Sequence, residues 1–409
     1  MIVLEYKIKG KQKQFQAIDE AIRTGQFVRN KALRYWMDNR GVNKYDLNKY
    51  SAVVAKEFDF ASRLNSTARQ SSAERAWSSI AKFFENCKKK IPGKKGYPRY
   101  KKHSRSVEYK KSGWKLDPET KKHITFTDKN NISRVKLVGS RDIYFYHPEQ
   151  IKRVRLVRRA DGYYVQFSIS IEVKEEVEPS GKAIGLDMGL KYFYADSFGK
   201  TESNPKFYRT AERKLNRLNR GKSVKYQRNQ KPQSNNYHKA RKRYALAHLK
   251  VSRQRKDHAV KLARCVATSN DCIVYEDLRV PNLVRNSKLA KSITDAGWTQ
   301  FRSWIEYYGW KMNKVTIAVP PHYTSQDCPN CNKRVKKSLS TRTHACECGC
   351  TLDRDYAASI QILRKGLSTV GHTGTYAWGD LPSWSVGYNL LTNGESLNQE
   401  SPNSTTERE

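Results

Sequence analysis

The chain has 409 residues and carries 79 Lys and Arg against 39 Asp and Glu, a formal net charge of +40. So large an excess of one sign goes beyond what solubility requires and indicates a polyanionic partner, for which nucleic acid is the first candidate. The competing interpretation, a basic membrane-surface protein, is weakened because the sequence has no long apolar run or amphipathic anchor near its N-terminus.

The N-terminal segments predict one strand and then a helical domain. Residues 1–10 alternate apolar and polar side chains as a strand does, and they lack the apolar core and cleavage site of a signal peptide. We therefore expect a soluble, intracellular protein of about two to four domains. In residues 11–90 the apolar side chains recur at helical spacing.

Residues 91–113 interleave Lys and Arg with Tyr, Gly and Pro, which predicts an exposed basic connector. Tyr97, Tyr100 and Tyr109 offer rings for stacking on bases, and Lys101 offers a charge for phosphate. A merely solvated loop is the competing interpretation. From 114 to 179 the apolar pattern changes to period two, which predicts a small β-domain that the first strand can complete.

Acidic residues border apolar segments at three places in the second half. Asp187 ends a short apolar strand, Glu276 ends another, and Asp353 and Asp355 open an apolar helix. Each acid alone is more often a cap or turn residue. Three separated carboxylates can nevertheless converge on two divalent ions for in-line phosphodiester hydrolysis. Their order, with a cysteine cluster before the third, predicts an RNase H-like nuclease of the RuvC type interrupted by a ribbon.

Five of the eight cysteines fall within residues 328–350, in a C-x-x-C pair followed by C-x-C-x-C. The spacing predicts a closed, structural zinc site with four thiolates. The first choice of ligands is Cys328, Cys331, Cys346 and Cys348, and Cys350 is a credible substitute. A disulfide pair or unrelated buried thiols is the competing interpretation.

Between the first two acids lies a strongly basic insertion, residues 205–265, in which 20 Lys and Arg face two acids from Lys206 to Arg264. Sparse leucines predict a helical hairpin with one thin apolar seam, although a solvated helix pair would have a similar pattern. Such a hairpin would hold a duplex backbone by charge and read no sequence. The candidate contacts are Arg213, Arg217, Arg241, Arg243 and Arg253.

Together, several segments resemble the signatures of TnpB, a family of transposon-encoded RNA-guided DNA nucleases related to type V CRISPR effectors. The resemblance covers nearly the whole chain and is strongest after Pro179. It rests on Gly185-Leu-Asp187-Met-Gly189, Val274-Tyr-Glu276-Asp-Leu278, Ser292-Ile-Thr-Asp295-Ala-Gly297-Trp298, Thr324-Ser-Gln-Asp-Cys328-Pro-Asn-Cys331 and Cys348-Gly-Cys-Thr-Leu-Asp353-Arg-Asp355.

The resemblance implies that Asp187, Glu276 and Asp355 are catalytic acids holding two Mg²⁺ ions, with Mn²⁺ as an alternative, and it favours Asp355 over Asp353. It implies one structural zinc, a guide RNA from the transposon end, double-stranded target DNA and one protein chain per RNA. It places the protein in the bacterial cytoplasm, at the nucleoid when bound to DNA, with no membrane partner. The family's usual Asn two residues after the third acid is Ala357 here.

The expected fold is therefore α+β and multidomain. A wedge-like β-barrel domain, with an N-terminal helical domain inserted, precedes an RNase H-like (RuvC) domain that carries a zinc ribbon. The expected parts are the first wedge strand 1–10, the helical recognition domain 11–90, the connector 91–113, the wedge body 114–179, the RuvC domain 180–325 with its insertion 205–265, the zinc ribbon 326–351, the last RuvC segment 352–366 and a partly disordered tail 367–409.

Two other functions remain open from the sequence. One is a compact type V CRISPR effector, or a domesticated guided DNA-binding regulator, with the same fold. The other is an unguided nucleic-acid-binding protein whose acids are structural. The intact set of three acids argues against a regulator without cleavage, whereas transposon and CRISPR contexts differ only in what lies beside the gene.

Overall fold

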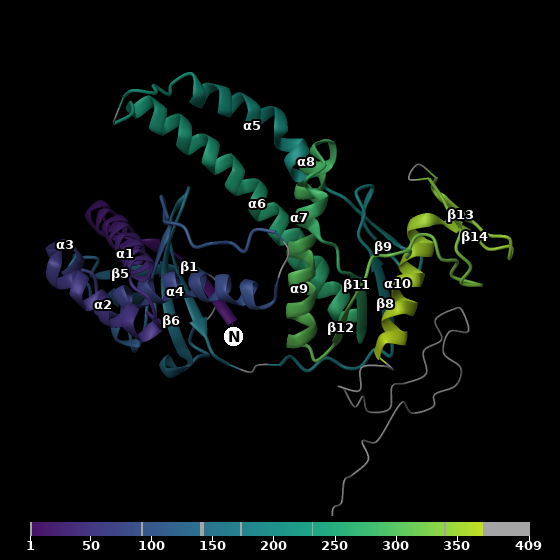
Figure 1. The fold of residues 1–409 in the computed structure, drawn as a ribbon, viewed down its shortest axis with the longest axis horizontal. Helices are drawn as coiled ribbons and strands as arrows, with labels where there is room; N and C mark the ends of the chain where they lie inside the picture. The colour runs from purple at the N-terminus through teal and green to yellow at the C-terminus, as the bar shows by residue number, and fades with distance from the viewer. Residues whose placement is uncertain are drawn as a thin grey trace, which may run out of the picture. The chain divides into compact units, whose positions relative to one another are not determined.

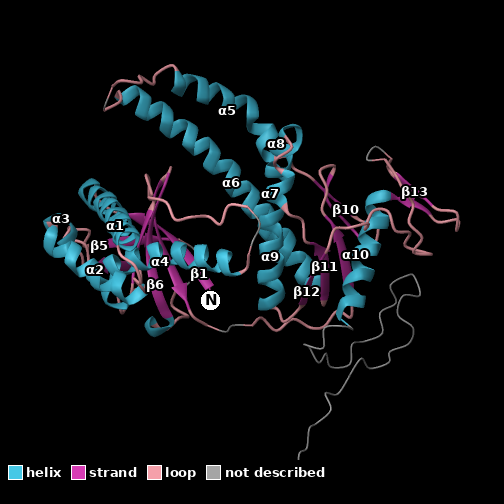
Figure 2. Cartoon of the chain, viewed as in Figure 1, coloured by secondary structure: helices cyan, strands magenta, loops and turns pink. Residues whose placement is uncertain are grey.

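A computed structural model describes residues 2–90, 93–139, 143–171, 174–230, 232–338 and 341–370 of the chain. They form two units, Met1–Glu172 and Val173–Glu409, whose elements are labelled in Figure 1 and coloured by type in Figure 2. Both units combine helices with strands, which confirms the predicted α+β, multidomain class. Most of the predicted tail lies outside the described residues.

A seven-stranded sheet, in the order β2-β6-β7-β1-β5-β4-β3, is the centre of the first unit. The predicted N-terminal strand joins it as β1, an interior strand antiparallel to both β5 and β7. Among the described residues β2 pairs only with β6 and β3 only with β4, so closure into a barrel is not confirmed. The strands are β1 (Ile2–Lys9), β2 (Ser106–Tyr109), β3 (Trp114–Leu116), β4 (His123–Phe126), β5 (Arg134–Val138), β6 (Ile151–Arg159) and β7 (Gly162–Ile169).

Helices of the first unit fall between β1 and β2, as the apolar spacing predicted. Ile18 and Ile22 of α1 pack with the buried face of the sheet, because the apolar residues of β1 alternate toward the same core. Farther along α1, Leu33 packs with Leu47 of α2 and Ile80 of α4 in a separate cluster. The helices are α1 (Gln12–Asp38), α2 (Lys44–Glu57), α3 (Asp59–Ser62) and α4 (Ser66–Lys88), with 3-10 turns at Lys111–Gly113 and Pro148–Gln150.

The second unit is built on a five-stranded sheet in the order β10-β9-β8-β11-β12. β8, β9 and β10 run antiparallel, whereas β11 is parallel to both β8 and β12. This combination is the RNase H-like arrangement that the order of the acids predicted. The strands are β8 (Ala183–Asp187), β9 (Tyr192–Asp196), β10 (Thr201–Ser203), β11 (Cys272–Glu276) and β12 (Val315–Val319).

Helices cover both faces of this sheet. Ile273 and Leu186 pack on one face against α6 and α9, while Val274 packs on the other against Leu363 of α10. A two-stranded ribbon of β13 and β14 precedes α10. The remaining elements are α5 (Phe207–Ser223), α6 (Asn235–Ser269), α7 (Val280–Leu283), α8 (Ser287–Ala296), α9 (Trp298–Lys311), β13 (Thr343–Ala345), β14 (Thr351–Asp353) and α10 (Arg354–Val370).

Within the residues described, no helix has the length and apolar content that a membrane crossing requires.

Candidate nuclease and zinc-ribbon sites

Two of the three predicted acids lie side by side at one edge of the second sheet. Asp187 is the last residue of β8 and Glu276 the last of β11. The two strands are parallel neighbours, with Leu186 opposite Tyr275, so their carboxyl ends meet at the same edge. This edge is where open sheets with parallel strands commonly place functional groups.

The third acid reaches the same edge because α10 packs very closely on β8 and β11. Gly185 faces the helix, and a Cβ atom added there would collide with the carbonyl oxygen of Ser359 and lie 2.8 Å from the backbone nitrogen of Leu363. Gly366 similarly leaves room for Val274 of β11. Asp355, in the first turn of α10, is therefore carried to the ends of the two strands.

The charges of the three acids influence one another. Burial, followed by the negative charges of Glu276 and Asp355, holds the pKa of Asp187 well above its ordinary value, and Arg354 opposes this shift. Burial likewise raises the pKa of Glu276, against a hydrogen bond from Thr324 and the charge of Lys365. Without a counter-charge, the surroundings of Asp187 and Glu276 favour their protonated forms, which a bound cation would reverse.

The structure separates the roles of Asp353 and Asp355. The carboxylate of Asp353 accepts hydrogen bonds from the backbone N–H groups of Asp355, at 2.8 Å, and Tyr356, at 3.4 Å, so it caps α10. Asp355 instead contacts Arg354, at 3.3 Å, and Arg342, at 3.5 Å. Its carboxylate is thus not used to cap the helix, which supports the preference for Asp355 as the third acid.

Two further residues of this site had no role in the sequence analysis. Thr324 donates from its hydroxyl to Glu276, at 2.5 Å. Lys365 donates to the carbonyl oxygen of His322, at 2.6 Å, and pairs with Asp327 at 3.6 Å. Thr324 stood within a family motif, but nothing in its local sequence showed that it faces Glu276. Nothing in the sequence around Lys365 indicated that this residue belongs to the site.

The three acids are candidate ligands for divalent metal ions. Hard cations such as Mg²⁺ take carboxylate oxygens as ligands. Among the described residues, the groups whose ligand atoms all lie within 4.8 Å of one another are those of the ribbon, and the three acids do not form such a group. In two-metal sites the ions are about 3.5–4 Å apart, so the outer carboxylates can be more widely spaced.

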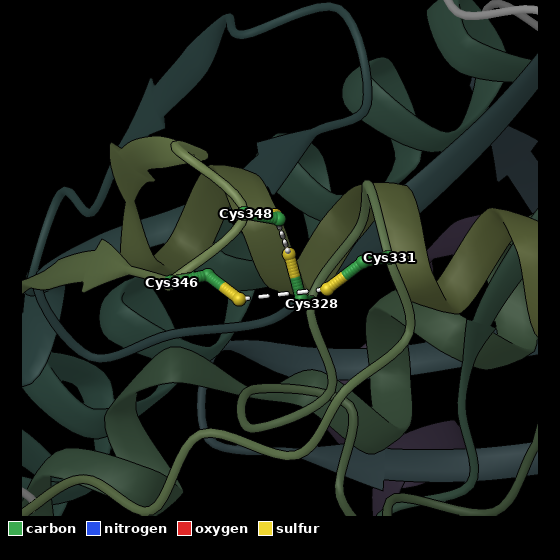
Figure 3. Close-up of side chains that lie close together, drawn as sticks. All are labelled: Cys328, Cys331, Cys346 and Cys348. Atoms are coloured by element: carbon green, nitrogen blue, oxygen red, sulfur yellow. Dashed lines mark hydrogen bonds between the residues drawn. The ribbon is translucent and has the colours of Figure 1, made fainter.

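The four cysteines predicted as zinc ligands converge. The Sγ atoms of Cys328 and Cys348 are 3.6 Å apart and those of Cys331 and Cys346 are 3.5 Å apart. Figure 3 draws the four side chains, with dashed lines between the sulfurs. All four sulfurs lie within 4.8 Å of one another. A tetrahedral zinc with bonds of about 2.3 Å would separate its sulfurs by roughly 3.8 Å. The cluster therefore has the dimensions that a four-thiolate zinc site requires.

Cys350 belongs to a different group, with Cys328 and His344. His344 is fully buried and its Nδ1 atom contacts the ammonium group of Lys337. Cys350 therefore also lies within 4.8 Å of Cys328, and it stays an alternative ligand to Cys346 or Cys348.

The basic insertion forms two helices that pack against each other, α5 and α6. Leu215 is the buried residue of α5, and α6 buries only small or aliphatic side chains. Of the leucines in the insertion, Leu215 is buried and Leu246 is exposed, so the predicted apolar seam is present only in part. All five predicted arginines are exposed on these helices: Arg213, Arg217, Arg241, Arg243 and Arg253.

The predicted connector divides into two parts. Tyr97 and Tyr100 are 54% and 46% exposed, and Lys101 is also exposed, so these groups are available to a ligand. Tyr109 is fully buried and donates to Asp128, at 2.6 Å. The prediction that the Tyr109 ring stacks on bases is wrong, because β2 continues the sheet and turns this ring into its core.

Comparison with known families accounts for this combination of sheet, acids and ribbon. Residues 166–287 match the OrfB_IS605 model, described as a probable transposase, and residues 298–362 match the Cas12f1-like TNB domain. The chain is therefore similar to TnpB-family proteins over the segments that carry its acids and cysteines. The two matches together span the first two acids, the ribbon and Asp355.

Two relatives of this chain have names that describe nucleases. A putative RNA-guided DNA endonuclease of Streptomyces pristinaespiralis is 29% identical over 326 residues, 76% of this chain and 74% of the relative. The putative RNA-guided DNA endonuclease InsQ of Escherichia coli K12 is 28% identical over 291 residues, 66% of this chain and 68% of the relative.

Solved structures share the fold at low sequence identity. The Cas12f1 protein in a complex with sgRNA and target DNA aligns with a TM-score of 0.52 at 13% identity, over 86% of this chain and 83% of that one. The mini-RNA-guided endonuclease Cas_phi3 aligns with a TM-score of 0.51 at 9% identity, over 90% and 92%. These likenesses support the multidomain α+β fold.

Proposed function

We propose that this chain is an RNA-guided DNA endonuclease, which cuts DNA complementary to a bound guide RNA next to a short flanking motif. The observation that supports this proposal most directly is that Asp187, Glu276 and Asp355 lie at one edge of the second sheet. The names of the two relatives, both RNA-guided DNA endonucleases, support the guided activity. The match to a probable transposase supports a guide from the transposon end.

Neighbouring strands, a hydrogen bond and ion pairs hold the three acids in positions from which they can bind divalent cations. Asp187 and Glu276 are fixed by neighbouring strands, and Thr324 holds the Glu276 carboxylate by a hydrogen bond. Arg342 and Arg354 hold the Asp355 carboxylate at the start of α10. Two Mg²⁺ ions, or Mn²⁺, bound there would activate a water molecule and stabilise the leaving oxygen of the phosphodiester.

The nucleic-acid contacts divide between charge and base pairing. Exposed arginines on α5 and α6 supply positive charge that neutralises phosphates of the guide RNA and of its duplex with DNA. Such contacts carry no sequence information, so pairing between guide and target chooses the DNA. One protein chain per RNA then acts on double-stranded DNA at the nucleoid, in the bacterial cytoplasm.

The ribbon supports the third acid through structure. Gln361, which is buried in α10, donates to the carbonyl oxygen of Cys328, at 2.6 Å, and to the Oδ1 atom of Asn332, at 3.2 Å. One zinc bound by the four thiolates would fix this turn, since thiolate coordination contributes directly to folding free energy. The zinc is thereby structural, and the carboxylates supply the reacting site.

The decisive experiment tests cleavage and binding separately. The protein is purified with its copurifying RNA, the RNA is sequenced, and a library of matching DNA targets with varied flanks is presented with Mg²⁺. Replacing Asp187, Glu276 or Asp355 with Ala should lower cleavage roughly 100-fold or more, because several kcal/mol of transition-state stabilisation is lost, while guided binding persists.

Asp353→Ala is the matched control, since it removes a neighbouring carboxylate that caps α10. It should cost about 1 kcal/mol of stability and retain most of the activity. Retained cleavage in Asp355→Ala with loss in Asp353→Ala would exchange their roles. Metal-independent cleavage, or RNA-independent DNA binding without any cleavage, would refute the proposed function.

A further inference from the structure

Four aromatic side chains gather where the ends of α1 and α4 meet the connector. The ring centroids of Trp36 and Phe84 are 5.9 Å apart, and those of Phe83 and Tyr97 are 5.3 Å apart, both edge to face. Phe84 and Tyr97 are 49% and 54% exposed. Two large rings are thus half open to solvent, and the four side chains Trp36, Phe83, Phe84 and Tyr97 are called the aromatic platform below.

Hydrogen bonds and packing hold the platform in place. Trp36 packs against the apolar cluster shared by α1, α2 and α4. Asn86 donates to the carbonyl oxygen of Lys95, at 2.9 Å, next to Tyr97. Asn30 both donates to and accepts from the backbone of Lys101, at 2.9 Å each way. A segment without regular structure is therefore fixed at two points, which orders its rings before any ligand binds.

The charge around the platform selects the kind of ligand. Residues 82–102 contain nine Lys and Arg and one Glu. A second copy of this chain would bring the same excess of positive charge, which opposes self-association through this face. A nucleic-acid strand supplies the opposite charge in its phosphates and apolar area in its bases. Exposed rings among Lys and Arg are the features by which proteins bind unpaired strands.

We propose that the aromatic platform stacks an unpaired base of the guide RNA, while neighbouring lysines neutralise the flanking phosphates. RNA presents unstacked bases in loops, bulges and ends, whereas the bases of double-stranded target DNA are already stacked. This assignment rests on the proposed function, because that function supplies the RNA. It adds a base-contacting surface in the first unit, separate from the carboxylates and from the arginines of α5 and α6.

The test compares the affinities of a single-stranded oligoadenylate and a blunt RNA duplex of equal length for the full chain. Phe84→Ala/Tyr97→Ala should weaken single-strand binding roughly 5- to 150-fold, the range for one lost stacked base, and leave duplex binding unchanged. The salt dependence of binding should keep its slope, since no phosphate contact is lost. Phe84→Tyr/Tyr97→Phe keeps both rings and should bind like the wild type.

Lys88→Ala/Lys94→Ala is the matched control, because it removes charge beside the platform and no ring. It should weaken both probes and lower the salt slope. Equal weakening of single strand and duplex by Phe84→Ala/Tyr97→Ala, or no weakening of either, overturns the proposal. So does a change in the molecular mass of that variant in light scattering, which would make the platform a surface between copies.

Crosslinking distinguishes the source of the base. In the complex purified with its RNA and without target DNA, ultraviolet light should attach a nucleotide to the peptide carrying Phe84 or Tyr97. Crosslinks that form only after target DNA is added would assign the platform to DNA and overturn the RNA assignment. A wild-type preparation that copurifies with no RNA would refute the proposed function itself, and the platform's ligand with it.

Discussion

Asp187→Asn is expected to stabilise the metal-free protein and to abolish its stabilisation by Mg²⁺. The side chain lies at the end of β8, where burial and the charges of Glu276 and Asp355 raise its pKa. An amide fills the same space without the charge. The variant therefore removes repulsion that the wild type relieves only by protonation or by binding a cation.

The size of the expected stabilisation follows from Coulomb's law, and its direction follows from the sign of the pKa shift. Two like charges about 6 Å apart repel by roughly 3 kcal/mol at an effective dielectric constant of about 20. Relaxation and partial protonation reduce this, so about 1–3 kcal/mol should be recovered. At about 2–4 °C per kcal/mol for a unit of this size, Tm should rise by roughly 2–12 °C.

The sign of the change in folding stability with pH follows from the difference between the folded and unfolded pKa values. The folded-state pKa values of Asp187 and Glu276 are raised, so the folded protein keeps protons that the unfolded chain releases. Stability from these groups is fully present below the ordinary carboxyl pKa of about 4 and falls as the pH rises toward the folded values. Added Mg²⁺ should reverse the loss, because it replaces the missing positive charge.

The assay is thermal unfolding of the wild type and Asp187→Asn with EDTA or Mg²⁺ across the acidic to neutral range. Asp196→Asn is the control, since that buried carboxylate accepts backbone hydrogen bonds from Phe198 and Lys200 at 2.9 Å each. It should leave the Mg²⁺-dependent shift intact. A variant less stable than the wild type in EDTA, or a wild type insensitive to Mg²⁺, would refute the electrostatic reasoning.

Three further predictions concern the ribbon, the sheet and the insertion. Cys328→Ser should reduce bound zinc from one per chain to near zero by metal analysis, whereas Cys350→Ser should keep it, and equal loss would contradict the ligand assignment. Gly185→Ala should destabilise the protein by about 1–3 kcal/mol in chemical unfolding because its Cβ meets the backbone of α10, while Gly221→Ala, with open space around it, should not. Arg213→Glu should lower RNA affinity and reduce the log-log salt slope by at least roughly 0.7–0.9 while target choice stays the same, and an altered set of cut sequences would contradict charge-only binding.

The sequence predicted most of the second unit because its signals are local. An apolar strand that ends in an acid can be recognised from its own few residues. Asp187 and Glu276 were therefore predicted as site residues from the segments in which they lie. The four ribbon cysteines were found from their spacing, and the structure brings their sulfur atoms together. Residue periodicity also located the helices of the first unit and the two basic helices.

Long-range contacts account for what the sequence did not show. Tyr109 stands among basic residues and prolines in the sequence, yet its strand pairs with β6 more than forty residues later and buries the ring. Barrel closure likewise depends on pairing between distant strands, which an alternating pattern cannot establish. Thr324 and Lys365 act on groups far along the chain, so only the fold places them beside Glu276.

The segment between β12 and the turn at Cys328 and Cys331 connects two of the acids, Glu276 and Asp355, with the ribbon. Thr324 binds Glu276 from this segment, Lys365 of α10 binds the carbonyl of His322, and Gln361 of the same helix binds the carbonyl of Cys328. Asp355 lies in the first turn of α10. Displacement of the turn at Cys328 and Cys331 would therefore move both Thr324, which binds Glu276, and the helix that carries Asp355. Zinc loss should therefore act on two acids at once, which makes its effect on cleavage larger than its distance from the reacting site would suggest.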